Sequence, residues 1–393
     1  MTSTSRSELK TKTATVVGYH GYQNLGDDIF RRVVCDWLSG SLGINKCHMS
    51  TQNDLTPLLT SRMKVLPFNT PLTRIARLLW INVFNRSLQS NALIFSAGSI
   101  FTIQPFFLIY LVLRLLRLFR GKGLQILAIG VSIGPFRNSR DQYWCLKGLS
   151  LMDQVLVRDF RSKSLIDMSE EVVNVTSSFD LALNWTPKPS RPKLVARPPL
   201  LGIALTERAF GSCKTHHTFN CNTLTEALHD TLTKFTDVRI KILCVCNDGR
   251  DGDRFISRHF QEALAKGWEN RVETIYYEND KIEEMEGIIA ECASLISARM
   301  HAGVVGMLAS VPVYQISYAE KIRNFYLHSE LSTRHLHDHT QLNQQSIVEF
   351  ISMSIMGELQ DFARTQKAIL EEKGRLVSSH LQQLAEKLHA RSI

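Results

Sequence analysis

Short runs of β-branched and aliphatic residues recur along this chain, each followed by a loop of small residues and then by a helical stretch. A strand, a loop, a helix and another strand in repeated order require crossover connections, which join parallel strands. The pattern therefore predicts an α/β protein. The predicted strands are residues 14–19, 92–96, 125–130 and 154–157 in the first half, and residues 200–205, 238–246, 293–297 and 311–316 in the second.

A proline-rich basic segment, residues 187–199, separates the two halves. Its five prolines cannot sustain a helix or a central strand. We predict two doubly wound, Rossmann-like domains in a GT-B-like arrangement, with the active site in the cleft between them, because ligands of open α/β sheets gather beyond the carboxyl ends of the strands. The predicted divisions are a tail at residues 1–13, domains at residues 14–190 and 200–340, and C-terminal helices at residues 341–393, including 346–359 and 368–389.

The composition restricts the partners and the compartment. A net charge of +9 favours anionic partners, but no long Lys/Arg run is present, so we predict no nucleic-acid partner. The eight cysteines lack zinc-ligand spacing, and buried free thiols suit a reducing cytoplasm. No metal-binding constellation is visible, and the first 13 residues lack the apolar core of a secretory signal. We therefore predict a cytoplasmic protein without a metal.

Residues 105–120, PFFLIYLVLRLLRLFR, form the most apolar stretch of the chain. The uninterrupted apolar run, residues 106–113, is much shorter than the roughly 20 residues that a spanning helix needs. Arg114, Arg117 and Arg120 recur at helical spacing and form a basic stripe. The segment is either a peripheral helix on an anionic membrane or a buried helix with its arginines at the rim.

Three loops of small residues follow predicted strands of the first half. Residues 18–28, GYHGYQNLGDD, contain Gly18 and Gly26 for close backbone approach, and Asn24 and Asp27 as helix caps. The second loop contains Gly98, and the third is residues 132–136. Each loop either binds a ligand or only turns the chain, but the ends of parallel strands converge on one edge. Arg158 and Asp159 follow the fourth strand, where they reach that edge or pair with each other.

The second half carries the most specific stretch, residues 295–325. A predicted strand ends at Arg299, and Met300 and His301 open a helix with a small, apolar face. The next strand ends at Ser317 and Tyr318, followed by Lys321, and Arg208 follows an earlier strand. Arginine binds planar anions through two hydrogen bonds, lysine supplies a point charge, and histidine moves protons near neutral pH. A dianionic substrate fits this set, whereas a capping or core role is the alternative for His301.

In these elements the chain resembles the polysaccharide pyruvyl transferase family, in the family's order over residues 14–325. The family's glycine-rich Asn-Leu-Gly-Asp opening is matched by residues 18–28, and its later Gly-rich loop by residues 96–101. Its Gly-Ile-Gly-Pro, Arg-Asp…Ser and Asp-x-Ala elements resemble residues 132–135, 158–162 and 180–182. Its Arg-Leu-His element with Pro-Val…Ser-Tyr…Lys is matched by residues 299–301, Pro312, Val313, Ser317, Tyr318 and Lys321.

The resemblance implies that phosphoenolpyruvate donates a pyruvyl group to a glycan, possibly one linked to a lipid, without a cofactor. It implies donor contacts from Arg299, His301 and Arg208, and we add Met300 and Lys321 to this set. His301 is the expected general acid or phosphate partner, and Asp180 or Asp27 is expected to hold or deprotonate the acceptor. The expected acceptor or loop residues are Gly18, Asn24, Gly26, Asp27, Gly98, Arg158, Ser317 and Tyr318.

The chain departs from the family pattern at three places. Ser96 and Ala97 stand where the family has glycines, and Met300 replaces a leucine. A histidine is missing from residues 246–253, CNDGRDGD, where Asp253 is the candidate for the family's acid. Two other functions therefore remain open: a GT-B glycosyltransferase that uses a nucleotide sugar, and a non-enzymatic, membrane-associated scaffold in polysaccharide assembly.

Overall fold

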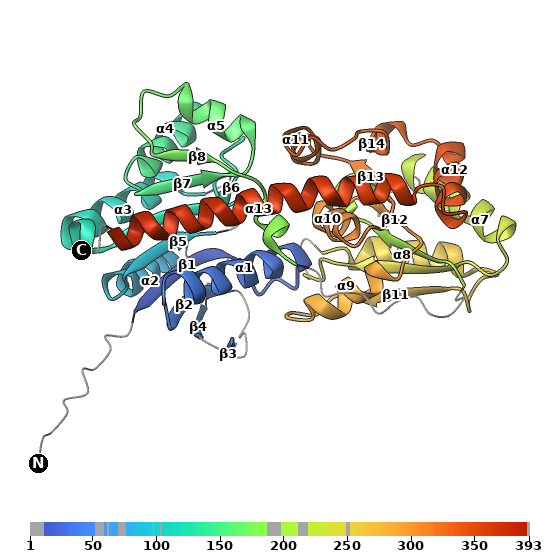
Figure 1. Cartoon of the computed structure of the whole chain (residues 1–393), viewed down its shortest axis with the longest axis horizontal. Coiled ribbons are helices and arrows are strands. Elements are labelled where there is room, and N and C mark those ends of the chain that lie inside the picture. Colours follow the sequence, from blue (N-terminus) through green and yellow to red (C-terminus); the bar gives the residue numbers. More distant parts are fainter. Residues whose placement is uncertain are drawn as a thin grey trace, which may run out of the picture. The chain divides into compact units, whose positions relative to one another are not determined.

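The computed structural model describes residues 12–51, 59–60, 63–69, 76–96, 98–102, 104–186, 198–210, 219–248 and 252–390 (Figure 1). These residues form two compact units, and each carries its own sheet. The N-terminal unit comprises the described residues within Met1–His20, Arg31–Ser178 and Ser379–Ile393, and the C-terminal unit those within Gly21–Phe30 and Phe179–Ser378. Residues 1–11 of the tail predicted at residues 1–13, Ala97, and residues 187–197 of the proline-rich segment lie outside the described residues. Thr13, the last residue of that predicted tail, begins β1.

The sheet of the N-terminal unit has the strand order β3-β4-β2-β1-β5-β6-β7-β8. Neighbouring strands are parallel, except that the short β3 pairs antiparallel with β4. The four predicted strands are confirmed, but β2, β3, β4 and β8 were not predicted. The bounds are β1 Thr13–His20, β2 Lys46–Thr51, β3 Leu59–Thr60, β4 Met63–Asn69, β5 Ala92–Phe95, β6 Gln125–Val131, β7 Gln154–Val157 and β8 Val175–Ser177.

Helices cover both faces of this sheet, because the chain winds outward from β1 in two directions. The crossovers on the β5-to-β8 side place their helices on one face, where they share a single apolar core with the strands. These helices are α2 (Ala76–Leu88), α3 (Phe106–Arg120), α4 (Ser139–Leu149) and α5 (Phe160–Asp167). The β1-to-β2 crossover runs the other way, so α1 (Leu25–Ser41) lies on the opposite face, where Trp37 Nε1 donates to the Leu381 carbonyl of α13 (Gln360–Ala390).

The sheet of the C-terminal unit is parallel throughout, in the order β11-β10-β9-β12-β13-β14. The four predicted strands are confirmed, and β11 and β14 were not predicted. The bounds are β9 Leu200–Ala204, β10 Arg239–Cys244, β11 Val272–Tyr276, β12 Ser294–Ser297, β13 Val313–Ser317 and β14 Leu336–Asp338. The chain thus folds into two parallel-sheet α/β domains, as the alternating pattern predicted.

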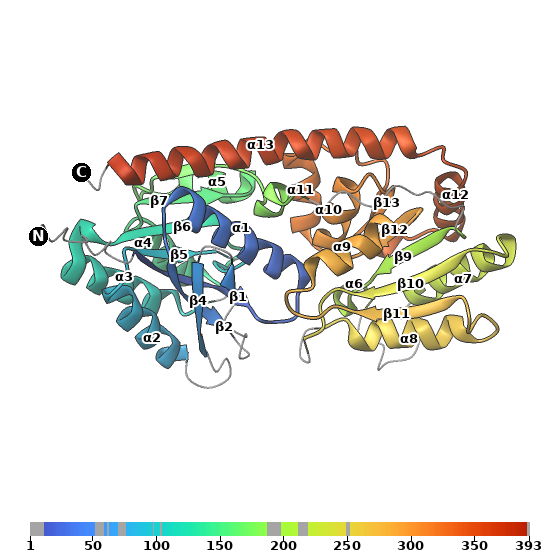
Figure 2. The same cartoon turned by 60° about the horizontal axis from the view of Figure 1, so that its bottom comes forward.

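The helices of this unit also divide between the two faces (Figure 2). One core joins the sheet to α7 (Phe219–Lys234), α8 (Arg254–Ala265) and α12 (Gln344–Ile355). The crossovers that run the other way carry α9 (Ile282–Ala290) and α10 (Met300–Leu308). The remaining elements are α6 (Glu207–Phe210), α11 (Glu320–His328), and the short 3-10 helices η1 (Gly121–Gly123), η2 (Leu181–Asn184) and η3 (His339–Gln341).

The C-terminal helices differ from their predicted bounds. The segment predicted at residues 346–359 is α12, and the one predicted at residues 368–389 is part of the 31-residue α13. Among the described residues, none of the helices combines the length and apolarity needed to cross a bilayer. The seven cysteines described are buried free thiols, and burial raises the pKa of Cys246 to about 11. Such thiols are unreactive near neutral pH.

Candidate functional site

Arg299 occupies the N-cap position of α10, directly after β12, and pairs with Asp253. Its Nε donates to both oxygens of the fully buried Asp253 carboxylate, at 3.0 and 2.9 Å, and its Nη2 contacts the same group. The Cys246 backbone N–H also donates to Asp253, at 3.2 Å. Burial raises the pKa of Asp253 to about 6 against the opposing effect of Arg299, and the Asp253 carboxylate raises the pKa of Arg299 although burial alone would lower it. The pair fixes the direction of the Arg299 guanidinium at the strand end.

His301 lies in the first turn of α10 and is partly exposed, unlike the other residues of that helix. Its Nε2 lies 3.6 Å from Oδ1 of Asp180, which is buried and caps η2 by accepting from the Ala182 N–H. The Phe30 ring meets the imidazole edge-on, with a centroid distance of 5.5 Å. The ring is therefore held against a carboxylate on one side and an aromatic ring on another, and these two contacts fix its orientation.

Gly26 approaches His301 so closely that only glycine fits there. A Cβ atom at residue 26 would lie 2.0 Å from Nδ1 of His301. The Asn24 side chain accepts from the Gly26 N–H at 3.0 Å, and the Leu25 N–H donates to the Val245 carbonyl at 3.0 Å. The Asn-Leu-Gly-Asp motif thus begins α1 and brings its first turn to the carboxyl ends of the C-terminal strands.

Asp27, which ends this motif, and Asp28, which follows it, have different surroundings. Asp28 is buried, and its Oδ2 accepts from the Tyr277 hydroxyl at 2.6 Å and from the Asp280 N–H at 3.1 Å. Asp27 and Arg299 both act on the pKa of Cys246, so they lie at the same strand ends. Asp28 therefore anchors the loop, whereas Asp27 belongs to the same neighbourhood as Arg299. The sequence did not single out Asp28, Tyr277 or Phe30, since a carboxylate and a phenol 249 residues apart carry no pattern.

Four further predicted residues lie at or after neighbouring strand ends. Ser317 ends β13, and Lys321, in the first turn of α11, is exposed with its Nζ 6.0 Å from the centre of the Tyr318 ring. Tyr318 is also among the groups that act on the pKa of Arg299. Arg208 is exposed in α6, after β9, the strand between β10 and β12. One edge of the C-terminal sheet therefore gathers arginine, histidine and lysine side chains from three crossovers. We call Arg299, His301, Asp180, Asp253 and Gly26 the strand-end site.

The N-terminal unit has its own cluster at the carboxyl end of its sheet. Arg158 is buried after β7, and its Nε donates at 2.8 Å to Ser132 Oγ, which donates at 2.6 Å to Asp159. A Cβ at Gly98 would lie 2.2 Å from Nη1 of Arg158. Asp159 also caps α5 through the Ser162 N–H. The sequence left open whether Arg158 reaches the sheet edge or pairs with Asp159. The structure shows Arg158 at the strand end and links it to Asp159 through the Ser132 hydroxyl.

Gly18 and Ser96 adjoin this cluster on β1 and after β5. A Cβ at Gly18 would lie 2.2 Å from the Ser96 carbonyl oxygen. The Ser50 hydroxyl accepts from the Gly18 N–H at 3.0 Å. Ser96 Oγ is buried without a hydrogen-bond partner among the described residues. The departure from the family's glycine at this position therefore places an unsatisfied hydroxyl beside β1.

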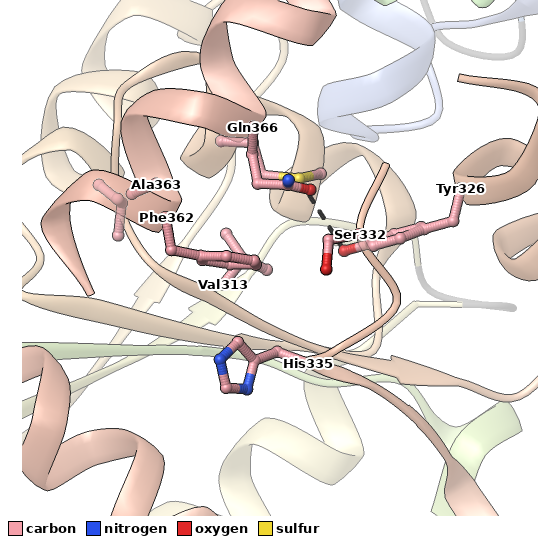
Figure 3. A pocket seen from close by; sticks show the side chains of 9 residues that line it. Val313, Tyr326, Ser332, His335, Phe362, Ala363 and Gln366 are labelled. Atoms are coloured by element: carbon pink, nitrogen blue, oxygen red, sulfur yellow. Dashed lines mark hydrogen bonds between the residues drawn. The ribbon is translucent and has the colours of Figure 1, made fainter. Parts of the chain in front are cut away.

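Two hollows of the C-terminal unit lie apart from the strand-end site. The first is a cavity of about 10 Å³, lined mainly by apolar side chains. The Tyr326 hydroxyl, which lies 3.9 Å from Met307 Sδ, is among the groups that line it (Figure 3). This volume suffices for about one water molecule, so it excludes a metabolite. A wider hollow of about 680 Å³ lies between α7 and α12, where Lys234, Asp230 and amide side chains gather without a second cation. Neither hollow has the cations that a dianion requires.

Comparison with known protein families gives a match that covers most of the chain. A family model described as polysaccharide pyruvyl transferase matches residues 24–320. No curated protein matches the chain significantly in sequence. The match begins at Asn24 and includes the strand-end site and the Arg158 cluster except for Gly18.

Solved structures share the fold at low sequence identity. A protein assigned as a UDP-N-acetylglucosamine 2-epimerase from Listeria monocytogenes is 12% identical, with a TM-score of 0.62 over 96% of this chain and 97% of that one. Anabaena Alr3699/HepE in complex with UDP and glucose is 14% identical, with a TM-score of 0.60 over 96% and 99%. Sucrose-phosphate synthase from Thermosynechococcus elongatus is 14% identical, with a TM-score of 0.59 over 97% and 100%. The chain therefore has a GT-B fold, as predicted.

Proposed function

Because the chain belongs to the polysaccharide pyruvyl transferase family, we propose that it transfers the pyruvyl group of phosphoenolpyruvate to a sugar residue of a polysaccharide or lipid-linked glycan. The product is a ketal, and phosphate is released. The observation that carries this proposal is the pair of Arg299 and His301 at the start of α10, each beside its own buried carboxylate. We place the reaction in the cytoplasm, with no cofactor besides the donor.

The reaction balances without a redox partner. A proton adds to the methylene carbon of phosphoenolpyruvate, and positive charge develops on the neighbouring carbon that carries the phosphate oxygen. A sugar hydroxyl attacks that carbon and loses its proton. A second hydroxyl then displaces phosphate and also loses its proton. One of these two protons replaces the one consumed, and the other leaves with hydrogen phosphate.

The groups for each of these steps come from the strand-end site and from its neighbours Arg208, Lys321, Met300 and Asp27. Arg299, Arg208 and Lys321 provide positive charge for the carboxylate and phosphate of the donor, which stabilises the leaving phosphate. The backbone N–H groups of Met300 and His301 lie in the first turn of α10, where such groups lack helical partners and favour anions. His301 delivers the proton, and Asp180 orients the imidazole. Asp27 holds the acceptor hydroxyl.

We assign Gly98 and Arg158 to acceptor binding, with Gly18, Asn24, Ser317 and Tyr318 supporting the loops.

The experiment that tests this function measures phosphate release from phosphoenolpyruvate in the presence of a panel of glycans, with mass spectrometry of the products. His301→Ala removes the proton donor, and the expected loss is about 100-fold or more. His259→Ala is the matched control, because His259 is an exposed histidine of α8 in the same unit. Equal rates in the His301→Ala variant and the unchanged protein would refute the assignment.

A nucleotide sugar is the second candidate donor, favoured by the fold that the chain shares with proteins solved in complex with UDP. Thermal unfolding with added uridine diphosphate or phosphoenolpyruvate separates the two donors. We expect phosphoenolpyruvate to raise the melting temperature and Arg299→Met to abolish that rise. A rise with uridine diphosphate alone would favour the glycosyltransferase.

A further inference from the structure

The charge of the chain is concentrated in one part of the N-terminal unit. Residues 55–140 contain 11 Lys and Arg and no Asp or Glu. Since the whole chain carries +9, the remaining residues together carry −2. The stretch includes α2, α3 and the beginning of α4, which lie on the same face of the N-terminal sheet. A stretch of chain that carries charges of one sign over so many residues favours an anionic partner.

The helix α3 has two apolar faces, and only one of them is covered. Phe106, Ile109, Val112, Leu113 and Leu116 are buried against the sheet and its neighbouring helices. On the other side, the exposed residues have the spacing of a single helical stripe, and their exposed fractions are unusually large for apolar side chains. They are Phe107 at 51%, Leu111 at 39% and Leu118 at 76%, with Arg114 in the same stripe. Phe119, 65% exposed, lies beside this stripe, and its ring is 6.2 Å from that of Phe84 on α2.

Aromatic side chains of α4 extend this stripe. The Trp144 ring lies 4.8 Å from the Phe107 ring, 5.1 Å from Tyr110 and 5.0 Å from Tyr143, measured between ring centroids. Tyr143 is 51% exposed, and Lys147 Nζ lies 5.6 Å from its ring centre. Tryptophan and tyrosine beside exposed aliphatic and basic residues are typical of surfaces that lie at a membrane–water interface.

The predicted basic stripe of α3 is only partly available to a partner. Arg117 pairs with Asp153 at 2.6 Å and donates to the Leu151 and Leu124 carbonyls. Arg120 donates to the Leu88 and Ser90 carbonyls. These two arginines therefore hold the helix in place. Exposed cations on α3 and at the beginning of α4 are Arg114, Arg137 and Arg140.

We propose that this α3–α4 face docks on an anionic phospholipid bilayer, with α3 lying in the plane of the interface. The exposed stripe enters the boundary between headgroups and acyl chains, and the surrounding arginines contact lipid phosphates. A nucleic acid would match the charge but would leave Leu118 and Phe119 without a partner, and a second copy would bring two basic faces together. The surface stands independently of the reaction proposed above.

Vesicle co-sedimentation of the full chain tests the proposal. The probes are vesicles of phosphatidylcholine alone and of equal parts phosphatidylcholine and phosphatidylglycerol. We expect binding to the anionic vesicles only, and a loss of at least about tenfold in the double variant Leu118→Glu/Phe119→Glu. The matched control is Met168→Glu/Val172→Glu, which adds the same charge at residues of the same unit that are 81% and 91% exposed. The control should bind as the unchanged protein does.

Circular dichroism of each variant checks the fold, and Leu118→Ser/Phe119→Ser replaces the glutamate pair if that pair misfolds. Absence of binding to anionic vesicles, equal binding to both kinds of vesicle, or equal losses in the variant and its control would overturn the proposal. Light scattering that showed a dimer dissolved by the Leu118 pair, without vesicle binding, would assign the face to a second copy instead.

Discussion

Both sheets place an arginine at the carboxyl end of a strand, immediately before a helix, but the two arginines are held differently. Arg299 in the C-terminal unit donates hydrogen bonds to the buried carboxylate of Asp253, which lies 46 residues earlier in the chain. Arg158 in the N-terminal unit donates to a serine hydroxyl, and that serine donates to Asp159. In each unit a glycine, Gly26 or Gly98, lies against the functional side chain.

The difference concerns the partner of each arginine, which is a charged carboxylate for Arg299 and a neutral hydroxyl for Arg158. A buried ion pair such as Arg299–Asp253 is costly to break, because removal of either partner strands a charge away from water. A hydroxyl partner such as Ser132 is neutral and can rotate toward another acceptor. We infer that the Arg299 edge is preorganised for one small dianion. The Arg158 edge can adjust to glycans of different shape.

The largest expected effect comes from removing each arginine in turn. Arg299→Met should destabilise the protein by about 3–5 kcal/mol, since Asp253 is left buried without its partner. Arg158→Met should cost less, about 1–2 kcal/mol, because the group that it leaves at Ser132 is a neutral hydroxyl and not a charged carboxylate. Urea unfolding followed by tryptophan fluorescence measures both. Equal losses in the two variants would remove the distinction between the edges.

A double variant separates the fold from the chemistry. Arg299→Met/Asp253→Leu removes both charges, so most of the lost stability should return, whereas phosphate release from phosphoenolpyruvate should not. If activity returned together with stability, Arg299 would be a structural residue only.

The two glycines give the next comparison, with a smaller effect on stability than on activity. A Cβ at residue 26 displaces the His301 ring, which Phe30 and Asp180 hold, so Gly26→Ala should lower kcat by about 100-fold. Gly98→Ala meets the end of the longer Arg158 side chain, and about a tenfold rise in KM for the glycan is expected. Steady-state kinetics with each substrate varied separately tests the split. Gly40→Ala, in open space on α1, is the matched control.

The sequence predicted the fold well where the strands are apolar runs. All eight predicted strands are present, because β-branched runs bounded by small-residue loops leave few alternatives. β2, KCHMST, was missed since polar residues occupy a strand that is buried between two neighbours. β4 contains Pro67, which argues against a strand although it pairs with β2. The length of α13 was underestimated because its first turns carry no cap that marks residue 360 as the start.

The sequence was enough to predict which residues belong to the candidate site, but not which residues they contact. The spacing of Arg299 and His301 directly after a predicted strand placed both at a helix start, where the structure has them. The partners come from far along the chain: Asp253 precedes α8, and Gly26 belongs to the first turn of α1. That residues 21–30 group with the C-terminal sheet depends on backbone hydrogen bonds such as that from Leu25 to Val245. Local patterns hold no information about such long-range pairs.

The smallest expected effect concerns a buried, uncharged histidine of the N-terminal unit, which contrasts with the paired charges around Arg299. His20 ends β1, is 1% exposed, and has both ring nitrogens buried without a hydrogen-bond partner among the described residues. Burial, together with the nearby Arg31 charge, lowers the pKa of His20 from 6.5 to about 3. The folded protein therefore keeps this imidazole neutral at pH values where the unfolded chain protonates it. Stability is fully present above pH 6.5 and falls by about 1.4 kcal/mol per pH unit as the pH drops toward 3.

His20→Leu should remove this dependence, because leucine fills the site and does not titrate. Between pH 6.5 and pH 5 the unchanged protein should lose about 2 kcal/mol more unfolding free energy than the variant, measured by urea unfolding at both values. Half-buried histidines such as His48 and His335, whose pKa burial also lowers, act in both proteins and cancel in the difference. Parallel pH profiles for the two proteins would mean that His20 takes up its proton in the folded state. The N-terminal edge would then hold a positive charge at His20, and the contrast with the paired charges around Arg299 would fail.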